Sequence, residues 1–232
     1  MAASPENLIA FALAVVSNAE GRPEDRYRAT FSTGNSGLSF GALQGDARVN
    51  PAARAVLTQI LNDARDRGTM SAETVQRVLT RGVTWNAAQR AADPQPLTAQ
   101  ELEQLNDALG TPASRALIDR MDQDQVARIA DSVWALMNAM VDRPTGPGCL
   151  DPLDWDPNPC ALLLAWCNRV GDLKQTQSWL RDADGQLTPA LVDRRLRGQK
   201  QFQPKPSGGG ESYDRWRARI LAGVPRVAVP VA

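Results

Sequence analysis

The chain has 232 residues, 43% of them hydrophobic, and its 26 basic residues balance 26 acidic ones. This content supports a sizeable core, and the balanced charge gives no reason to expect a nucleic-acid partner. Histidine is absent, which excludes Ser-His and Cys-His nucleophilic sites and HExxH zinc sites.

The first predicted helix begins at Ser4-Pro5, where serine is a preferred cap and proline suits the first turn. Residues 8–16 are apolar on most faces, which predicts a buried, central helix. No basic region precedes this stretch, and no small-residue cleavage site follows it before Glu20. We therefore interpret it as a core helix and expect no signal peptide.

Glu20 falls in or just past the last turn of this helix. A carboxylate there meets the negative end of the helix dipole, which disfavours its ionised form. A carboxyl group that keeps its proton near neutral pH is what a general acid requires. The structural alternative is a solvated residue at a helix end.

A β-hairpin is predicted next, because two short runs with period-two alternation flank a cluster of Gly, Asn, Ser and Thr. The runs are Thr30–Ser32 and Leu38–Phe40. Gly41 and Gly45 follow, and each lets the backbone approach a helix or a ligand closely.

Helices are expected through the rest of the chain, each with recognisable start and stop signals. Their expected ranges are 51–67, 71–82, 85–92, 98–110, 112–143 with a break near Asp122–Asp124, 159–166, 175–180 and 211–221, and another helix is expected to begin at Thr188-Pro189. A Pro/Gly-rich loop is expected over 144–159, and a polar connection over 201–210. The predicted fold class is mainly α (α+β), with a central buried helix, a small hairpin subdomain and a larger helical lobe.

Six tryptophans are present. Trp134, Trp166 and Trp216 stand at helical spacing and are expected in the core, whereas Trp85 and the loop residue Trp155 are the better candidates for exposure. Trp155 is a candidate sugar-stacking residue.

Three cysteines, at positions 149, 160 and 167, form no CxxC pair. A zinc or thioredoxin-type site is therefore not expected. Cys149 and Cys160 bracket a loop and could pair in an exported protein, and Cys167 is expected to be a small buried hydrophobe. No metal and no organic cofactor is predicted.

The segment from Pro189 to Ala232 contains nine basic residues and three acidic ones. This excess of positive charge suits binding of an anionic polymer, or a solvated surface.

Helix, glutamate, small hairpin and then helices is an order that resembles the lysozyme superfamily. The resemblance covers residues 8–46 and depends on Glu20-Gly21, Ser36–Gly41 and Gly41–Asp46. Phage-type and pesticin-type muramidases carry Glu-Gly at the end of the first long helix, and their hairpin reads roughly Ser-Gly-Val-Thr-Ile-Gly. Lytic transglycosylases instead show Gly-Leu-Met-Gln after their catalytic glutamate, which is similar to Gly41-Ala42-Leu43-Gln44.

This resemblance implies a peptidoglycan-degrading glycoside hydrolase that cleaves the β-1,4 bond between N-acetylmuramic acid and N-acetylglucosamine, as endolysins and other bacteriolytic enzymes do. Glu20 would be the general acid, Asp46 the second carboxylate and Ser39 the residue that holds the attacking water. Asp46 lies one residue further from Ser39 than the pesticin pattern requires. Gln44, Gly41 and Trp155 would contact the saccharide.

Each of these residues also has a purely structural interpretation. Asp46 could fold its own loop, Ser39 could occupy the polar face of a strand, and Gln44 could pack within a loop. The rival functions are a lytic transglycosylase, a chitosanase with the same fold, and a non-catalytic wall-binding or phage/secretion structural module.

The expected partner is peptidoglycan or a related polysaccharide, bound by a monomer, with no nucleic acid and no membrane span. Without a leader, the protein would reach the wall after lysis or through a dedicated secretion machine. The predicted domains are a lysozyme-like catalytic domain over 1–200 and a basic segment over 201–232 that packs on it.

Overall fold

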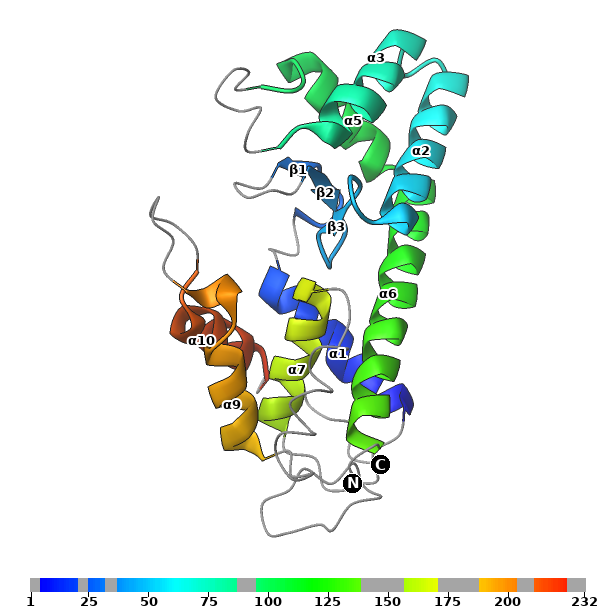
Figure 1. The fold of residues 1–232 in the computed structure, drawn as a ribbon. Helices are drawn as coiled ribbons and strands as arrows, with labels where there is room; N and C mark the ends of the chain where they lie inside the picture. Colours follow the sequence, from blue (N-terminus) through cyan, green and yellow to red (C-terminus); the bar gives the residue numbers. More distant parts are fainter. Residues whose placement is uncertain are drawn as a thin grey trace. The chain divides into compact units, whose positions relative to one another are not determined.

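The computed structural model describes residues 5–20, 25–31, 37–86, 95–138, 157–170, 188–203 and 211–224. The chain is mainly helical with one small antiparallel sheet (Figure 1), so the predicted class, mainly α (α+β), is confirmed. Its residues form two compact units. One comprises Glu20–Asp124, and the other combines Met1–Ala19 with Gln125–Ala232.

The unit Glu20–Asp124 holds the sheet. Its elements are β1 (Thr30–Phe31), β2 (Leu38–Phe40), β3 (Gly45–Asp46), α2 (Pro51–Asp66), α3 (Ala72–Arg77), the π-helix η2 (Val78–Gly82), α5 (Ala99–Gly110) and the first part of α6 (Pro112–Asn138). The strands are antiparallel in the order β1-β2-β3. The predicted hairpin is confirmed by the β1–β2 pair, and β3 is an additional strand.

The core of this unit forms where the sheet meets the helices. Leu38 and Phe40 of β2 are fully buried, and they belong to one cluster with the apolar face of α2. That face repeats at helical spacing, because residues three and four apart share one side of a helix. It consists of Ala53, Leu57, Ile60, Leu61 and Ala64.

The predicted helix starts in this unit are confirmed by their caps. The Asn50 side chain accepts hydrogen bonds from the amides of Ala52 and Ala53, and Thr98 forms a complete capping box with Glu101. Such caps satisfy main-chain donors that the first turn of a helix leaves unpaired.

The break expected near Asp122–Asp124 was wrong, because α6 is continuous from Pro112 to Asn138. An aspartate favours a helix break when its side chain competes for nearby main-chain groups. The Asp122 side chain is instead buried and accepts a hydrogen bond from the distant amide of Ala42.

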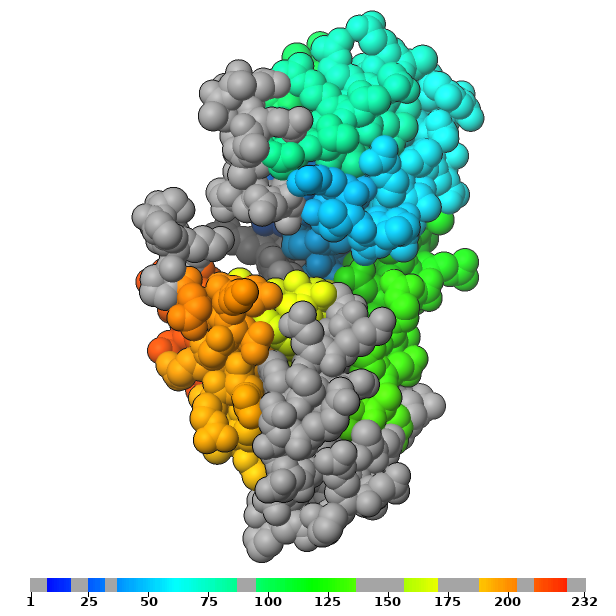
Figure 2. Space-filling model, viewed as in Figure 1, coloured from blue at the N-terminus to red at the C-terminus, as the bar shows by residue number. Residues whose placement is uncertain are grey.

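The second unit is built from helices in the part that the structure describes. They are α1 (Pro5–Glu20, of which the unit holds all but Glu20), the rest of α6, α7 (Pro157–Val170), α9 (Pro189–Arg197), the 3₁₀ turn η3 (Lys200–Phe202) and α10 (Tyr213–Gly223). The cap predicted at Thr188 is confirmed. Helices α9 and α10 lie side by side (Figures 1 and 2).

An aromatic cluster forms the core around α7, α9 and α10. Phe202 packs at 5.0 Å from Trp216 and 5.3 Å from Tyr213, measured between ring centroids, and at 6.0 Å from Trp166. The core positions predicted for Trp166 and Trp216 are confirmed, whereas Trp134 is half-buried. The polar connection predicted from residue 201 onward missed Phe202, which is buried because these rings enclose it.

Candidate functional site

The three strands bring Thr30, Ser39 and Asp46 into one row across the sheet. Thr30 is the register partner of Ser39, and Ser39 is the partner of Asp46 on the next strand. Neighbouring strands lie about 4.8 Å apart. The structure therefore brings together two of the predicted catalytic residues, Ser39 and Asp46. Ser39 is nearly fully buried, at 3% exposure.

The Asp46 carboxylate accepts hydrogen bonds from main-chain amides just before β2 and just after β3. Its Oδ1 accepts a hydrogen bond from the Arg48 amide at 2.9 Å, and both oxygens lie within 3.3 Å of the Gly37 amide nitrogen. These contacts hold the carboxylate in a defined place. They are also the contacts expected of the loop-folding interpretation of Asp46.

Gln44 folds back onto the same row. It is the one non-glycine residue with a positive φ in the described chain, at 51°. This is the left-handed backbone region, which residues other than glycine rarely adopt. The Thr30 hydroxyl donates to Gln44 Oε1 at 2.6 Å, and Gln44 Nε2 donates to the Gly41 carbonyl oxygen at 3.2 Å. The predicted saccharide contact Gln44 is thus tied to Thr30 and Gly41, and its side chain is half-buried.

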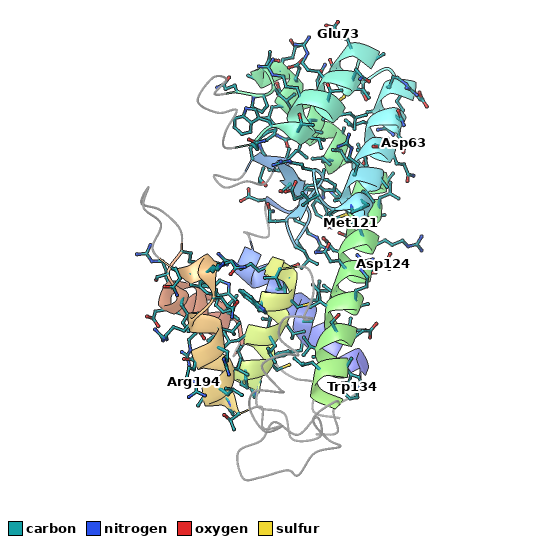
Figure 3. All side chains as sticks on the ribbon, viewed as in Figure 1. Asp63, Glu73, Met121, Asp124, Trp134 and Arg194 are labelled. Atoms are coloured by element: carbon teal, nitrogen blue, oxygen red, sulfur yellow. The ribbon has the colours of Figure 1, made fainter. Side chains whose placement is uncertain are left out.

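Gly41 begins the turn that carries Gln44, and only glycine fits there. Its φ is +84°, and a Cβ at this position would lie 2.7 Å from Oδ1 of Asp122. Met121, labelled in Figure 3, would be the next neighbour, with its Cε at 3.2 Å. The close approach expected at Gly41 is therefore to helix α6.

Asp122, on helix α6, anchors this turn. Its Oδ2 accepts the Ala42 amide at 2.8 Å and lies 3.4 Å from Nη2 of Arg26, which also pairs with Asp119 at 2.9 Å. Oδ1 of Asp122 and Nε of Arg26 are buried and have no hydrogen-bond partner among the atoms that the structure describes. Removing the Arg26 guanidinium would strongly destabilise the fold, because it would leave a carboxylate that is fully removed from water without its opposite charge.

Burial raises the pKa of the Asp122 carboxyl above its ordinary value, against the opposing influence of the Ala42 amide and the Arg26 guanidinium. Desolvation penalises the charged form of an acid, and here it is the largest cause. The group nearest the Gly41 turn is consequently a carboxyl with an increased tendency to hold a proton.

The spacing of the residues around Asp122 indicates a buried side chain on a continuous helix, where local composition alone predicts a helix break. Ile118, Asp122 and Val126 are spaced by four residues, which places an acid within an apolar helix face. All three are buried. An acid in such a stripe indicates a buried, partnered carboxylate as readily as a helix end.

The other predicted site residues fall outside these contacts. Glu20 is the last residue of α1, as predicted, but its side chain lies outside the described residues, as do Trp155 and Cys149. The exposure predicted for Trp85 is wrong. Trp85 is 5% exposed and packs edge-on against Phe31 at 5.5 Å between centroids, because the β1 strand covers it.

Neither a metal centre nor a bilayer-crossing helix is found in the part of the chain that the structure describes. No group of three or more Cys, Asp or Glu residues within that part could hold a metal ion. None of the helices there combines the length and apolar character that a membrane crossing needs. Cys160 and Cys167 are both buried in α7.

Comparison with known proteins adds no relative: no family model, no curated protein and no solved structure matches the chain.

Proposed function

We propose that the chain is a peptidoglycan-degrading glycoside hydrolase of lysozyme-like fold, with Glu20 as general acid. The observation that carries this proposal is the register of the sheet. A helix that ends at Glu20 is followed by three antiparallel strands on which Ser39 and Asp46 are direct partners. Glycoside hydrolysis uses an acid on the leaving oxygen and a second group at the oxocarbenium-like centre, and this arrangement supplies candidates for both.

In this proposal Glu20 protonates the glycosidic oxygen. Asp46, held by the amides of Gly37 and Arg48, is the second carboxylate. Ser39 orients the attacking water, and Gln44 borders the saccharide. The Asp122 carboxylate positions the Gly41–Gln44 turn through Ala42 and is not a catalytic residue.

A lytic transglycosylase is the alternative that one observation favours. Gln44 matches the glutamine of that group, and its side chain is held in place between Thr30 and Gly41. The two reactions differ in the group that attacks the sugar, which is water in one and the 6-hydroxyl of the substrate in the other. Mass spectrometry distinguishes the reducing ends left by hydrolysis from the anhydro ends left by transglycosylation. Chitosan as a second substrate tests the chitosanase activity.

The decisive experiment is zymography on purified peptidoglycan with wild type, Glu20→Gln and Glu103→Gln. Glu103 is an exposed glutamate of α5, so its replacement controls for the chemical change alone. We expect Glu20→Gln to lose about 100-fold or more of the clearing activity, as is typical for removal of a general acid. Glu103→Gln should clear like wild type.

Circular dichroism of all three proteins shows that the fold is kept. Equal clearing by wild type and Glu20→Gln would remove Glu20 from the mechanism. If the wild-type protein clears no peptidoglycan but sediments with it, the chain is the non-catalytic wall-binding module instead.

A further inference from the structure

A pocket of about 510 Å³ lies within the unit Glu20–Asp124, at the junction of α5 and α6. It is separate from the row Thr30–Ser39–Asp46. Its polar lining residues are Tyr27, Arg28, Asn106, Asp107, Thr111 and Arg115. We call it the Arg28–Arg115 pocket.

Two guanidinium groups dominate this lining. Arg28 and Arg115 form no ion pair with a carboxylate of the described chain, whereas Arg26 beside them is paired with Asp119 and Asp122. The Arg115 guanidinium lies over the Tyr27 ring, 5.0 Å from its centroid. A cation held over an aromatic face is oriented without its hydrogen-bond donors being used.

The pocket offers one further donor. Asn106 Oδ1 accepts a hydrogen bond from the Ala29 amide at 2.9 Å. The amide orientation of Asn106 is thereby assigned, and its NH₂ group is the part left for another partner.

The Tyr27 ring is poorly suited to stack on a neutral sugar. The Arg26 and Arg115 guanidiniums lie 5.4 Å and 5.0 Å from its centroid, and its hydroxyl donates to Asp119 at 2.8 Å. A lining of two cations and an amide donor, with the aromatic face already occupied, favours a negatively charged ligand.

We propose that the Arg28–Arg115 pocket binds a small oxyanion, either a carboxylate or a phosphate group. Arginine suits both because its planar fork donates two parallel hydrogen bonds to paired oxygens. Asp107 is the one acidic member of the lining, so the pocket keeps a net charge of +1 and Asp107 opposes the anion. This inference does not depend on Glu20 and goes beyond the proposed hydrolase activity.

The test is a titration of ¹⁵N-labelled full chain, followed by its amide NMR shifts. Three probes are used, namely inorganic phosphate, acetate and the neutral sugar N-acetylglucosamine. We expect saturable shifts for residues 27–29 and 106–115 with phosphate or acetate, weaker at high ionic strength because salt screens the charges. The tighter of the two anions identifies the class of ligand.

Four variants give the result its meaning. Arg28→Gln and Arg115→Gln should each weaken anion binding by about tenfold or more, the scale of a lost hydrogen bond to a charged group. Asp107→Asn should tighten it. Arg120→Gln is the matched control, because Arg120 is an exposed arginine of the same helix outside the pocket, and it should bind like wild type.

Amide shifts that are retained far from the pocket show that a variant is folded. If Arg115→Gln does not fold, Arg115→Lys replaces it, since lysine keeps the charge and loses the planar fork that donates two parallel hydrogen bonds. Anion shifts that are unchanged by Arg28→Gln and by the Arg115 variants would overturn the proposal. So would N-acetylglucosamine binding at the same residues more tightly than both anions. The Glu20→Gln variant should bind the anion normally, so failure of this proposal and failure of the hydrolase proposal are distinguished.

Discussion

The two units of the molecule use the same small motif in different ways. Each contains one of the two tyrosines of the chain. In each, the tyrosine hydroxyl donates to an aspartate at 2.8 Å, Tyr27 to Asp119 and Tyr213 to Asp193. In each, an arginine guanidinium lies over the ring.

The surroundings of the two rings differ. Tyr213 is buried among Phe202 and Trp216, and the guanidinium over it, that of Arg197, is itself paired with the exposed Asp214. Its charged groups face water, where ion pairs contribute little to stability.

Tyr27 is half-buried and lines a pocket. The Arg26 guanidinium beside it pairs with the fully buried Asp122, and Arg115 has no carboxylate partner among the described residues. The unit Glu20–Asp124 thus keeps charge buried next to a turn with positive φ. Such costly features concentrate where a protein binds or reacts, and this supports the proposal that the functional site belongs to this unit.

The largest expected effect is in the other unit. Trp216→Ala should cost about 3–5 kcal/mol of unfolding free energy, because it leaves a cavity in the aromatic cluster. Trp85 is the one tryptophan within 20–124, so ¹⁹F NMR of 5-fluorotryptophan-labelled protein follows each unit separately during urea unfolding. A resonance of Trp85 that shifts as strongly as that of Trp166 would show that the two cores are not independent.

Gly41→Ala should cost about 2–4 kcal/mol, the sum of a left-handed backbone penalty and an overpacked site. The new methyl group would be forced toward Oδ1 of Asp122. Gly68→Ala is the matched control, since Gly68 also has a positive φ, 72°, but has open space around it. The difference between the two variants in urea unfolding measures the cost of the contacts with Asp122 and Met121.

Asp122→Asn should cost about 1–2 kcal/mol near pH 4, through the weakened hydrogen bond from the Ala42 amide. The folded-state pKa of Asp122 is raised from 3.8, so the folded state holds more protons than the unfolded state above pH 3.8. Wild-type stability from this group therefore falls as pH rises from 3.8 through the raised pKa. Urea unfolding from pH 4 to pH 8 should show the cost of the variant shrinking. A cost that grows with pH would mean that Arg26 governs the carboxyl more strongly than burial does.

The smallest effects are expected from Tyr27→Phe and Tyr213→Phe, at about 1 kcal/mol each for a lost hydrogen bond. Burial and the neighbouring aspartate raise the pKa of each phenol above 10.0. Stability should therefore fall as pH rises above 10, where the unfolded chain loses phenolic protons first. Alkaline titration at 295 nm of the two variants assigns each step, and Tyr213, the more buried, should ionise last.

Much of the helical framework could be predicted from local chemistry. The caps at Asn50, Thr98 and Thr188 are where the sequence predicts them, because a cap is satisfied within three residues of the chain. The hairpin was predicted from its alternation for the same reason. Glu20 was correctly expected in or just past the last turn of its helix, since the apolar pattern of residues 8–16 ends just before it.

The candidate site was less predictable. Asp122 was expected to break a helix and instead binds a turn 80 residues earlier in the chain. Trp85 was expected to be exposed and is instead covered by strand β1. Both outcomes depend on contacts between distant segments, which no local pattern encodes.

By itself the amino-acid sequence determined the helical class, the helix starts and the position of the hairpin, because propensity, capping and alternation act over a few residues. Only the tertiary structure decided that Ser39 and Asp46 are partners, that Gly41 must remain glycine, and that Arg28 and Arg115 share a pocket. Those outcomes depend on which surfaces meet, and the burial of a charge is a property of the folded neighbourhood rather than of the residue.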